Sequence, residues 1–368
     1  MSCYPSASLD ALIVSVVPRL EATGASALVA IDPSSLELLA VRSFPASEYL
    51  KGVGTPRSVL IEHSRGLSRW GGRLCVAMFN GVRHYEVADA RSLSLVPGEI
   101  LSHPRAVDLH GVCVHGDELF AASTGADAVI CWSLRDGTSR LLALCAAGER
   151  DLRFPACLAL RDGYEDWRAV LPARLHVNDV CALNCNDMVV CSLREIREVQ
   201  GDRVRVLYAD QHALLHDGRP LGDDARLLFS DAATGELVIV DRDGAPPARI
   251  AIAPPNKWFL RGAGVIGGYA VALCSMLGET RQRATVRAGT SKPRGSGGYF
   301  AIAVIDLDTH QIAARRTIQT PELSTGVVAY AIVPWRKEIT QPKAGVEIFR
   351  PGVSLSWRSM NTSNSYIP

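Results

Sequence analysis

The sequence lacks the features that would place it among exported, membrane-spanning or nucleic-acid-binding proteins. The N-terminus has no basic region before an apolar core, and no apolar run approaches the ~18 residues of a membrane-spanning helix. Its 39 basic and 38 acidic residues leave a net charge of +1, so the whole chain carries no excess positive charge for nucleic acid. We expect a cytoplasmic protein with a small-molecule substrate and neither a nucleic-acid nor a membrane partner; the oligomeric state stays open.

Disulfide patterns and common cofactor motifs are missing as well. Ten cysteines are scattered over 368 residues, in a chain large enough to bury a core without cross-links. Cys181, Cys185 and Cys191 form no Cys-x-x-Cys pair, which indicates free core thiols. No phosphate-binding loop, dinucleotide fingerprint, His-Glu-x-x-His or Gly-x-Ser-x-Gly motif occurs. No cofactor is therefore predicted, apart from a transition metal that histidines could bind.

The chain does have a hydrophobic period of two along most of its length. Short alternating or apolar segments, such as 118–123, 226–231 and 299–306, are bounded by Gly, Asp, Asn or Pro, which is typical of β-strands. Helical patterns are scarce, and only 165–171 and 196–199 are weak candidates. The sequence predicts an all-β protein.

The strands recur in a unit of roughly 40–50 residues, the repeat length of a four-stranded propeller blade. Each unit begins with a polar residue, then Gly or Asp and an apolar strand. We predict a six-bladed β-propeller over 1–335, closed by N- and C-terminal strands, and a surface-packed or partly disordered tail over 336–368. A pair of β-sandwiches or seven irregular blades are the alternatives. The basic segment 281–296 has no interleaved aromatic residues and is expected to be a solvated loop.

In a propeller, the first residues of the innermost strands converge on the mouth of the axial channel, although they lie far apart in sequence. We expect this ring to contain Arg65, His110, Asn178, His216, Arg261 and Tyr330, with His176 two residues before Asn178 on the same strand face. The predicted ring is rich in donors and poor in carboxylates, which suits an anionic substrate or a developing oxyanion. The alternative is that these side chains only satisfy backbone groups at the ends of the blades.

The segment Leu175-His-Val-Asn-Asp-Val-Cys, which leads to Ser192-Leu-Arg194, is similar to the His-x-Asn strand of bacterial arylsulfotransferase propellers. Gln211-His212 is a second local similarity to that family. The resemblance implies that His176, Asn178 and Arg194 bind sulfuryl oxygens. It also implies that His212 carries the transferring group and that His110 is a further channel histidine. The intervals are shorter than in that family, and the export signal expected of it is missing.

A broader stretch resembles bacterial propeller-like proteins of unknown function. It includes Asp108-Leu-His-Gly-Val, Phe259-Leu-Arg-Gly-Ala-Gly and Val327-Val-Ala-Tyr-Ala, and it adds Ser275 and Glu279 as channel candidates. The gluconolactonase group is a looser likeness, because Asn178-Asp179 and Asp217 fit its calcium ligands only in part. Arginine and histidine in the ring disfavour Ca²⁺.

Three hypotheses of function follow. The leading one is an enzyme with histidine-centred group transfer, cyclisation or isomerisation of an anionic or phenolic small molecule. It would use His110, His176 and His212 as catalytic residues, and Trp258 would contribute to the floor of the pocket. The second is a metalloenzyme with hydrolytic or oxidative chemistry, whose ligands would be His110, His176 and His216 or His212. The third is a non-catalytic binding or scaffold propeller.

Overall fold

The computed structural model describes residues 9–18, 26–44, 47–49, 58–60, 65–103, 105–143, 175–184, 187–201, 203–222, 224–253, 258–276, 299–320 and 327–336. The candidate helix 165–171, the basic segment 281–296, Glu279, Cys185 and the tail beyond residue 336 lie outside them.

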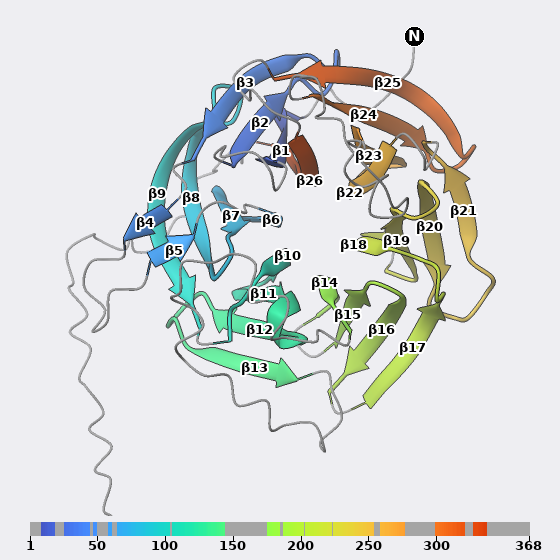
Figure 1. Ribbon diagram of the computed structural model, residues 1–368, viewed down its shortest axis with the longest axis horizontal. Coiled ribbons are helices and arrows are strands. Elements are labelled where there is room, and N and C mark those ends of the chain that lie inside the picture. Colours follow the sequence, from blue (N-terminus) through green and yellow to red (C-terminus); the bar gives the residue numbers. More distant parts are fainter. Residues whose placement is uncertain are drawn as a thin grey trace, which may run out of the picture. The chain divides into compact units, whose positions relative to one another are not determined.

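Six four-stranded antiparallel sheets surround a central axis as the blades of a β-propeller (Figure 1). We number the blades in chain order and give their strands from the axis outward. Blade 1 consists of β6 (Leu67–Trp70), β7 (Arg73–Ala77), β8 (Gly81–Asp89) and β9 (Ser94–Ser102). Blade 2 consists of β10 (Leu109–His115), β11 (Glu118–Ser123), β12 (Ala128–Ser133) and β13 (Ser139–Ala143). Blade 3 consists of β14 (Val177–Ala182), β15 (Asp187–Ser192), β16 (Glu195–Gln200) and β17 (Arg203–Ala209).

The second half of the chain continues the same order. Blade 4 consists of β18 (Leu215–Leu221), β19 (Arg226–Asp231), β20 (Glu236–Asp241) and β21 (Ala248–Ala251). Blade 5 consists of β22 (Trp258–Ile266), β23 (Tyr269–Met276), β24 (Tyr299–Asp306) and β25 (Gln311–Gln319). Blade 6 consists of β26 (Val327–Trp335), β1 (Ala11–Pro18), β2 (Ala27–Ile31) and β3 (Leu38–Ser43). The six-bladed prediction is confirmed.

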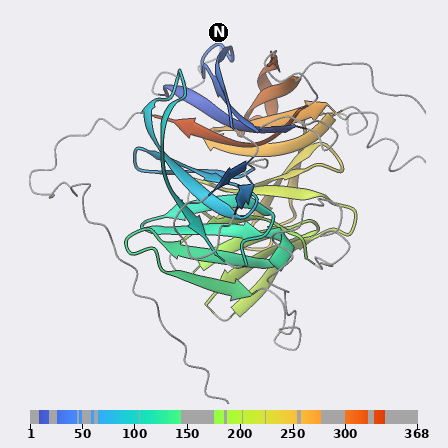
Figure 2. The ribbon, with the colours of Figure 1, turned by 60° about the vertical axis from the view of Figure 1, so that its left-hand side comes forward.

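Blade 6 closes the ring with strands from both ends of the described chain. The innermost strand β26 pairs antiparallel with β1, with Leu12 opposite Pro334 and Val14 opposite Ile332. In Figures 1 and 2 the red β26 and the blue β1 and β2 lie side by side. The predicted closure by N- and C-terminal strands is confirmed, and it removes the free sheet edge that an open ring would have.

The core lies between neighbouring blades. Residues of β2 and β14 are buried throughout, whereas most of the outermost strands β17 and β25 is exposed. Leu12 and Val29 of blade 6 pack with Leu273 and Phe300 of blade 5 in one apolar cluster. Because each blade buries one face against each neighbour, the strands carry the continuous apolar runs that marked the repeat in the sequence.

Regular helix is nearly absent from the described residues. One 3₁₀ turn covers Thr124–Ala126, and a short hairpin pairs β4 (Ser47–Tyr49) with β5 (Ser58–Leu60). The weak helix candidate at 196–199 was wrong: Ile196 and Val199 lie in β16, where they pair with Tyr208 and Val204 of the edge strand. No helix in the described ranges is long and apolar enough to cross a membrane.

Candidate functional site

Five of the six innermost strands contain a β-bulge at the pocket. In β10, β14, β18, β22 and β26 the pairing register shifts at one point of the strand. The residues at these bulges include His110, Asn178, Asp217, Arg261 and Tyr330, one from each of five successive blades. A β-bulge re-aims side chains and bends its strand. The five bulges therefore turn polar side chains toward the axis at the same level.

These side chains line a pocket on the axis. The empty space between them, its solvent-open mouth included, is about 280 Å³. Six of the seven residues that the sequence placed in a channel ring lie in its wall: Arg65, His110, Asn178, His216, Arg261 and Tyr330. The structure thus brings the predicted ring together, while the role of its members stays a prediction.

One side of the pocket is a cluster of cations and rings. Arg65 forms a buried ion pair with Asp108, with 2.5 Å between Nη1 and Oδ1, and it also contacts Nε2 of His110. Nη2 of Arg261 lies 3.2 Å from Nδ1 of His110, and its guanidinium lies 4.0 Å from the centre of the Tyr330 ring. Burial, followed by the charge of Arg65, holds the pKa of His110 well below 6.5. His110 is therefore a neutral ring between two guanidiniums at neutral pH.

The pocket wall also contains carboxylates, which corrects the expectation of a ring poor in them. Asp179 and Asp217 line the pocket together with Arg219. Asp179 Oδ2 accepts hydrogen bonds from the Gly218 N–H at 2.6 Å and from Arg219 Nη1 at 2.9 Å. Strict alternation would turn the residue after Asn178 or His216 away from the axis. The bulges break this alternation, so both neighbours reach the channel wall.

Asp217 and Asp179 are both buried carboxyl groups with a raised pKa. Both hydrogen bonds that the described residues donate to its carboxylate end on Oδ2, from the Gly262 N–H at 2.7 Å and the Ser230 hydroxyl at 2.9 Å. Burial, reinforced by the charge of Asp179, raises the pKa of Asp217 to about 6. Burial also raises the pKa of Asp179. Asp217 is therefore a lining carboxyl group that can both hold and release a proton near neutral pH.

Two buried polar atoms in the pocket wall have no hydrogen-bond partner among the described residues. They are Nε of Arg65, a donor, and Oδ1 of Asn178, an acceptor. The amide of Asn178 is fixed from its other end, because Nδ2 donates to the Leu215 carbonyl at 2.8 Å. A buried polar atom left without a partner costs about 1–3 kcal/mol. This pair therefore marks a place where a ligand with both an acceptor and a donor would be stabilised.

Glycines let the inner strands approach closely enough to form this wall. A Cβ on Gly111 would overlap the side chain and backbone of Asp179 in the next blade, and one on Gly66 would overlap the backbone at His110. Gly262 has a φ of 89°, a conformation that side chains rarely adopt. The Gly that follows the polar residue in the repeat thus has a packing role.

His176 lies beside the pocket and not in its wall. It precedes β14, has a φ of 52°, and its N–H donates to Asp127 Oδ1 at 2.7 Å. The expectation that it shares a strand face with Asn178 was therefore wrong. Its ring contacts His110 edge-on, with 5.6 Å between the centroids, and burial lowers its pKa to about 4.

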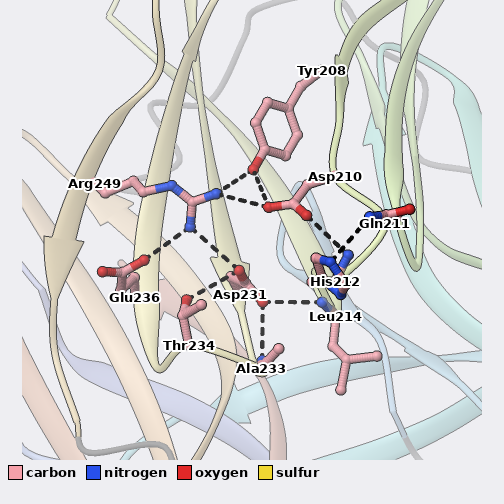
Figure 3. A network of polar contacts seen from close by, with 10 residues as sticks. All are labelled: Tyr208, Asp210, Gln211, His212, Leu214, Asp231, Ala233, Thr234, Glu236 and Arg249. Carbon is pink, nitrogen blue, oxygen red and sulfur yellow. Dashed lines mark hydrogen bonds and ion pairs between the residues drawn. The ribbon is translucent and has the colours of Figure 1, made fainter.

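Two other residues taken from the arylsulfotransferase resemblance are exposed and not in the pocket wall. His212 lies on the connection between β17 and β18, and Arg194 lies on the connection between β15 and β16. His212 belongs to a surface network, in which its N–H donates to Asp210 and its ring contacts Gln211 (Figure 3). Arg249 joins this network to Asp231, the aspartate of the β19–β20 turn. The placement of His212 with the channel residues was therefore wrong.

The two remaining candidates, Trp258 and Ser275, make contacts within or between blades. Trp258 packs edge-on against Tyr299 and lies under Arg315, both in the same blade, and it does not line the pocket. The buried hydroxyl of Ser275 accepts the Ala329 N–H at 2.8 Å, which joins blades 5 and 6. These contacts favour structural roles for both.

The three-histidine metal site is not assembled in the described part of the chain. There, no group of three His, Cys, Asp or Glu side chains converges in a way that could hold a metal ion. Both ring nitrogens of His110 face guanidiniums, and His212 is exposed. Guanidiniums at this distance repel a cation, so the residues present do not fit a metal at this place.

No family model and no curated protein matches the chain. Among solved structures, a chain of a nidogen/laminin complex shows a TM-score of 0.53 and 10% identity over 88% of this chain and 98% of its own. The periplasmic gluconolactonase PpgL of Pseudomonas aeruginosa shows 0.50 and 10% over 89% and 99%. A putative 6-phosphogluconolactonase of Bacteroides fragilis shows 0.48 and 9% over 87% and 98%. The first two likenesses, at 10% identity, show the propeller fold alone.

Proposed function

We propose that the central pocket binds a small anionic molecule that carries a hydroxyl group, and that the protein is an enzyme acting on it by proton transfer. The observation that carries the proposal is a pair of buried atoms, Nε of Arg65 and Oδ1 of Asn178, that have no hydrogen-bond partner in the described part of the chain. An anionic oxygen would accept from the first, and a hydroxyl group would donate to the second.

The charges of the wall favour an anion when Asp217 is protonated. Arg65, Arg219 and Arg261 then face two carboxylates, Asp108 and Asp179, each of which is paired with an arginine. Arginine forks match planar carboxylates well. Anion binding and proton uptake by Asp217 should therefore favour each other.

Asp217 is the group that we assign to proton transfer. A general acid or base works best when its pKa lies near the working pH, and the pKa of Asp217 is about 6. His110, in contrast, is neutral and has a guanidinium beside each ring nitrogen, so we assign it to positioning Arg65 and Arg261. His216 and Tyr330 complete the wall.

Titration calorimetry with three matched probes tests the proposal. Lactate carries a carboxylate and an adjacent hydroxyl, propionate lacks the hydroxyl, and propane-1,2-diol lacks the carboxylate. We expect lactate to bind and each of the other two to bind at least about tenfold more weakly, since each loses one hydrogen bond to a buried group. Equal binding of lactate and propionate, or no binding of any of the three, would overturn the proposal.

An Arg65→Lys variant sharpens the same experiment. Lysine keeps the positive charge beside Asp108 but removes the Nε donor and the planar fork. We expect lactate affinity to fall about tenfold while propane-1,2-diol binding stays unchanged. An Arg69→Lys variant is the control, because Arg69 lies outside the pocket lining and its Nε donates to the Gly71 carbonyl at 2.9 Å.

A further inference from the structure

A second ring of side chains follows the pocket residues on four neighbouring blades. Its members stand three residues after Arg65, His110, Asn178 and His216: they are Ser68, Cys113, Cys181 and Arg219. The Ser68 hydroxyl accepts the Val114 N–H of the next blade at 3.0 Å. The Cys113 sulfur accepts the Ala182 N–H of the next blade in the same way, at 3.5 Å.

This pattern stops at Cys181 for a reason in the sequence. The equivalent donor in the next blade would be residue 220, which is proline and has no N–H. The Cys181 thiol instead lies 4.0 Å from the carbonyl oxygen of Ala182, the residue whose N–H donates to Cys113. Both sulfurs therefore contact the backbone of Ala182, at the boundary between blades 2 and 3.

The backbones are close enough for this contact. Two residues earlier on the same two strands, a Cβ on Gly111 would overlap the Cα of Asp179. The strands β10 and β14 thus run side by side where Cys113 and Cys181 meet. Two thiols that contact the same residue from neighbouring strands need only side-chain movements to reach disulfide distance.

The two thiols are chemically unequal. The hydrogen bond from Cys181, then the Ala182 N–H and the charge of Arg219, lower the pKa of Cys113. The same contact with Cys113 raises the pKa of Cys181. Burial raises the pKa of the other cysteines that the structure describes, to about 12 for Cys75 and Cys274. Cys113 is the nucleophile of the pair, because thiolates react and thiols do not.

We propose that Cys113 and Cys181 form an oxidisable dithiol, a modification site for hydroperoxides next to the central pocket. The Cys113 thiolate attacks hydrogen peroxide; an S–O bond forms, the O–O bond breaks, and the leaving hydroxide takes a proton to become water. The Cys181 sulfur then attacks the Cys113 sulfur. The S–S bond forms, the S–O bond breaks, and the thiol proton of Cys181 leaves with the hydroxyl as a second water. The two sulfurs lose two electrons in total, which the peroxide gains.

Peroxide treatment of the folded full-length protein, followed by alkylation under denaturing conditions and peptide mass spectrometry, tests this inference. We expect a peptide pair joined through Cys113 and Cys181, restored to two alkylated peptides by dithiothreitol. Cys181→Ser should stop at a Cys113 sulfenic acid that dimedone traps, and Cys113→Ser should abolish both products.

A Cys274→Ser variant is the matched control, because this buried thiol has a raised pKa and no cysteine partner among the described residues. It should form the disulfide at the wild-type rate. The inference would be overturned if, after oxidation, Cys113 and Cys181 both remained alkylatable, or if dimedone labelled Cys181→Ser no faster than Cys113→Ser. Measuring the wild type alone keeps the test valid should a variant fail to fold.

Discussion

Replacing Asp217 by Asn should change how stability depends on pH. The pKa of this carboxyl is raised from 3.8 to about 6, mainly by burial. An acid whose pKa is raised in the folded state gives full stability below its unfolded pKa, and stability is lost as the pH rises toward the folded pKa. Because a tenfold change in proton affinity corresponds to about 1.4 kcal/mol, ionised Asp217 costs on the order of 3 kcal/mol above pH 6.

The asparagine of the Asp217→Asn variant has no charge to bury, yet its amide oxygen can still accept from the Gly262 N–H and from Ser230. Urea unfolding of both proteins between about pH 4 and pH 7.5 is the assay. The free energy of unfolding of the wild type, relative to the variant, should fall by about 2.4 kcal/mol across this window.

A control variant with the opposite dependence of stability on pH tests the assignment to Asp217. Hydrogen bonds from Ser34 and Ser35 hold the pKa of Asp32 below its usual range. Asp32→Asn should therefore lose stability near neutral pH and approach the wild type as the pH falls. Parallel pH profiles for the wild type and the Asp217→Asn variant would refute the argument that a buried, near-neutral carboxyl group lines the pocket.

Three further predictions follow from the same contacts. Lactate affinity should rise as the pH falls through 6, and calorimetry should detect proton uptake; an affinity that does not change with pH would disconnect Asp217 from the ligand. Gly111→Ala should destabilise the fold by about 1–3 kcal/mol in urea unfolding, because its Cβ would overlap Asp179. Gly72→Ala, with no atom near its Cβ, should change stability by less than about 0.5 kcal/mol, and equal effects would contradict the account of close strand approach. Ser15→Ala should lower the free energy of unfolding by about 2–3 kcal/mol, measured in the same way. The buried Ser15 hydroxyl donates to the carbonyl of Arg65, which leads into blade 1, and accepts the N–H of Ala331 in its own blade 6.

The propeller architecture and the ring of channel residues were predictable because both depend on features that repeat along the sequence. The alternation of apolar residues marked the strands, and the recurring polar-residue–Gly step at Arg65, His110 and Arg261 marked the start of each inner strand. In a closed propeller these starts must converge on the axis. The pocket wall at these positions follows from symmetry and needs no knowledge of side-chain contacts.

The carboxylates and the histidine placements were not predictable in the same way. A bulge is a local register shift, and it reverses the face of every later residue in its strand. Asp179 and Asp217 therefore reach the channel, whereas His176 leaves the strand. His212 sits on a connection between blades, whose path no periodic pattern reports. A polar residue directly followed by Asp or Gly at each strand start was the one available signal of the bulges.

The central claim is that Arg65 and Asn178 hold a hydroxylated anion in the channel. A crystal structure of the protein soaked with lactate, solved to a resolution that separates ordered water from ligand, tests it most directly. We predict one lactate on the axis, its carboxylate accepting from Nε of Arg65 and its hydroxyl donating to Oδ1 of Asn178. Ordered water alone on these two atoms, under conditions that saturate any lactate site measured in solution, would contradict the account.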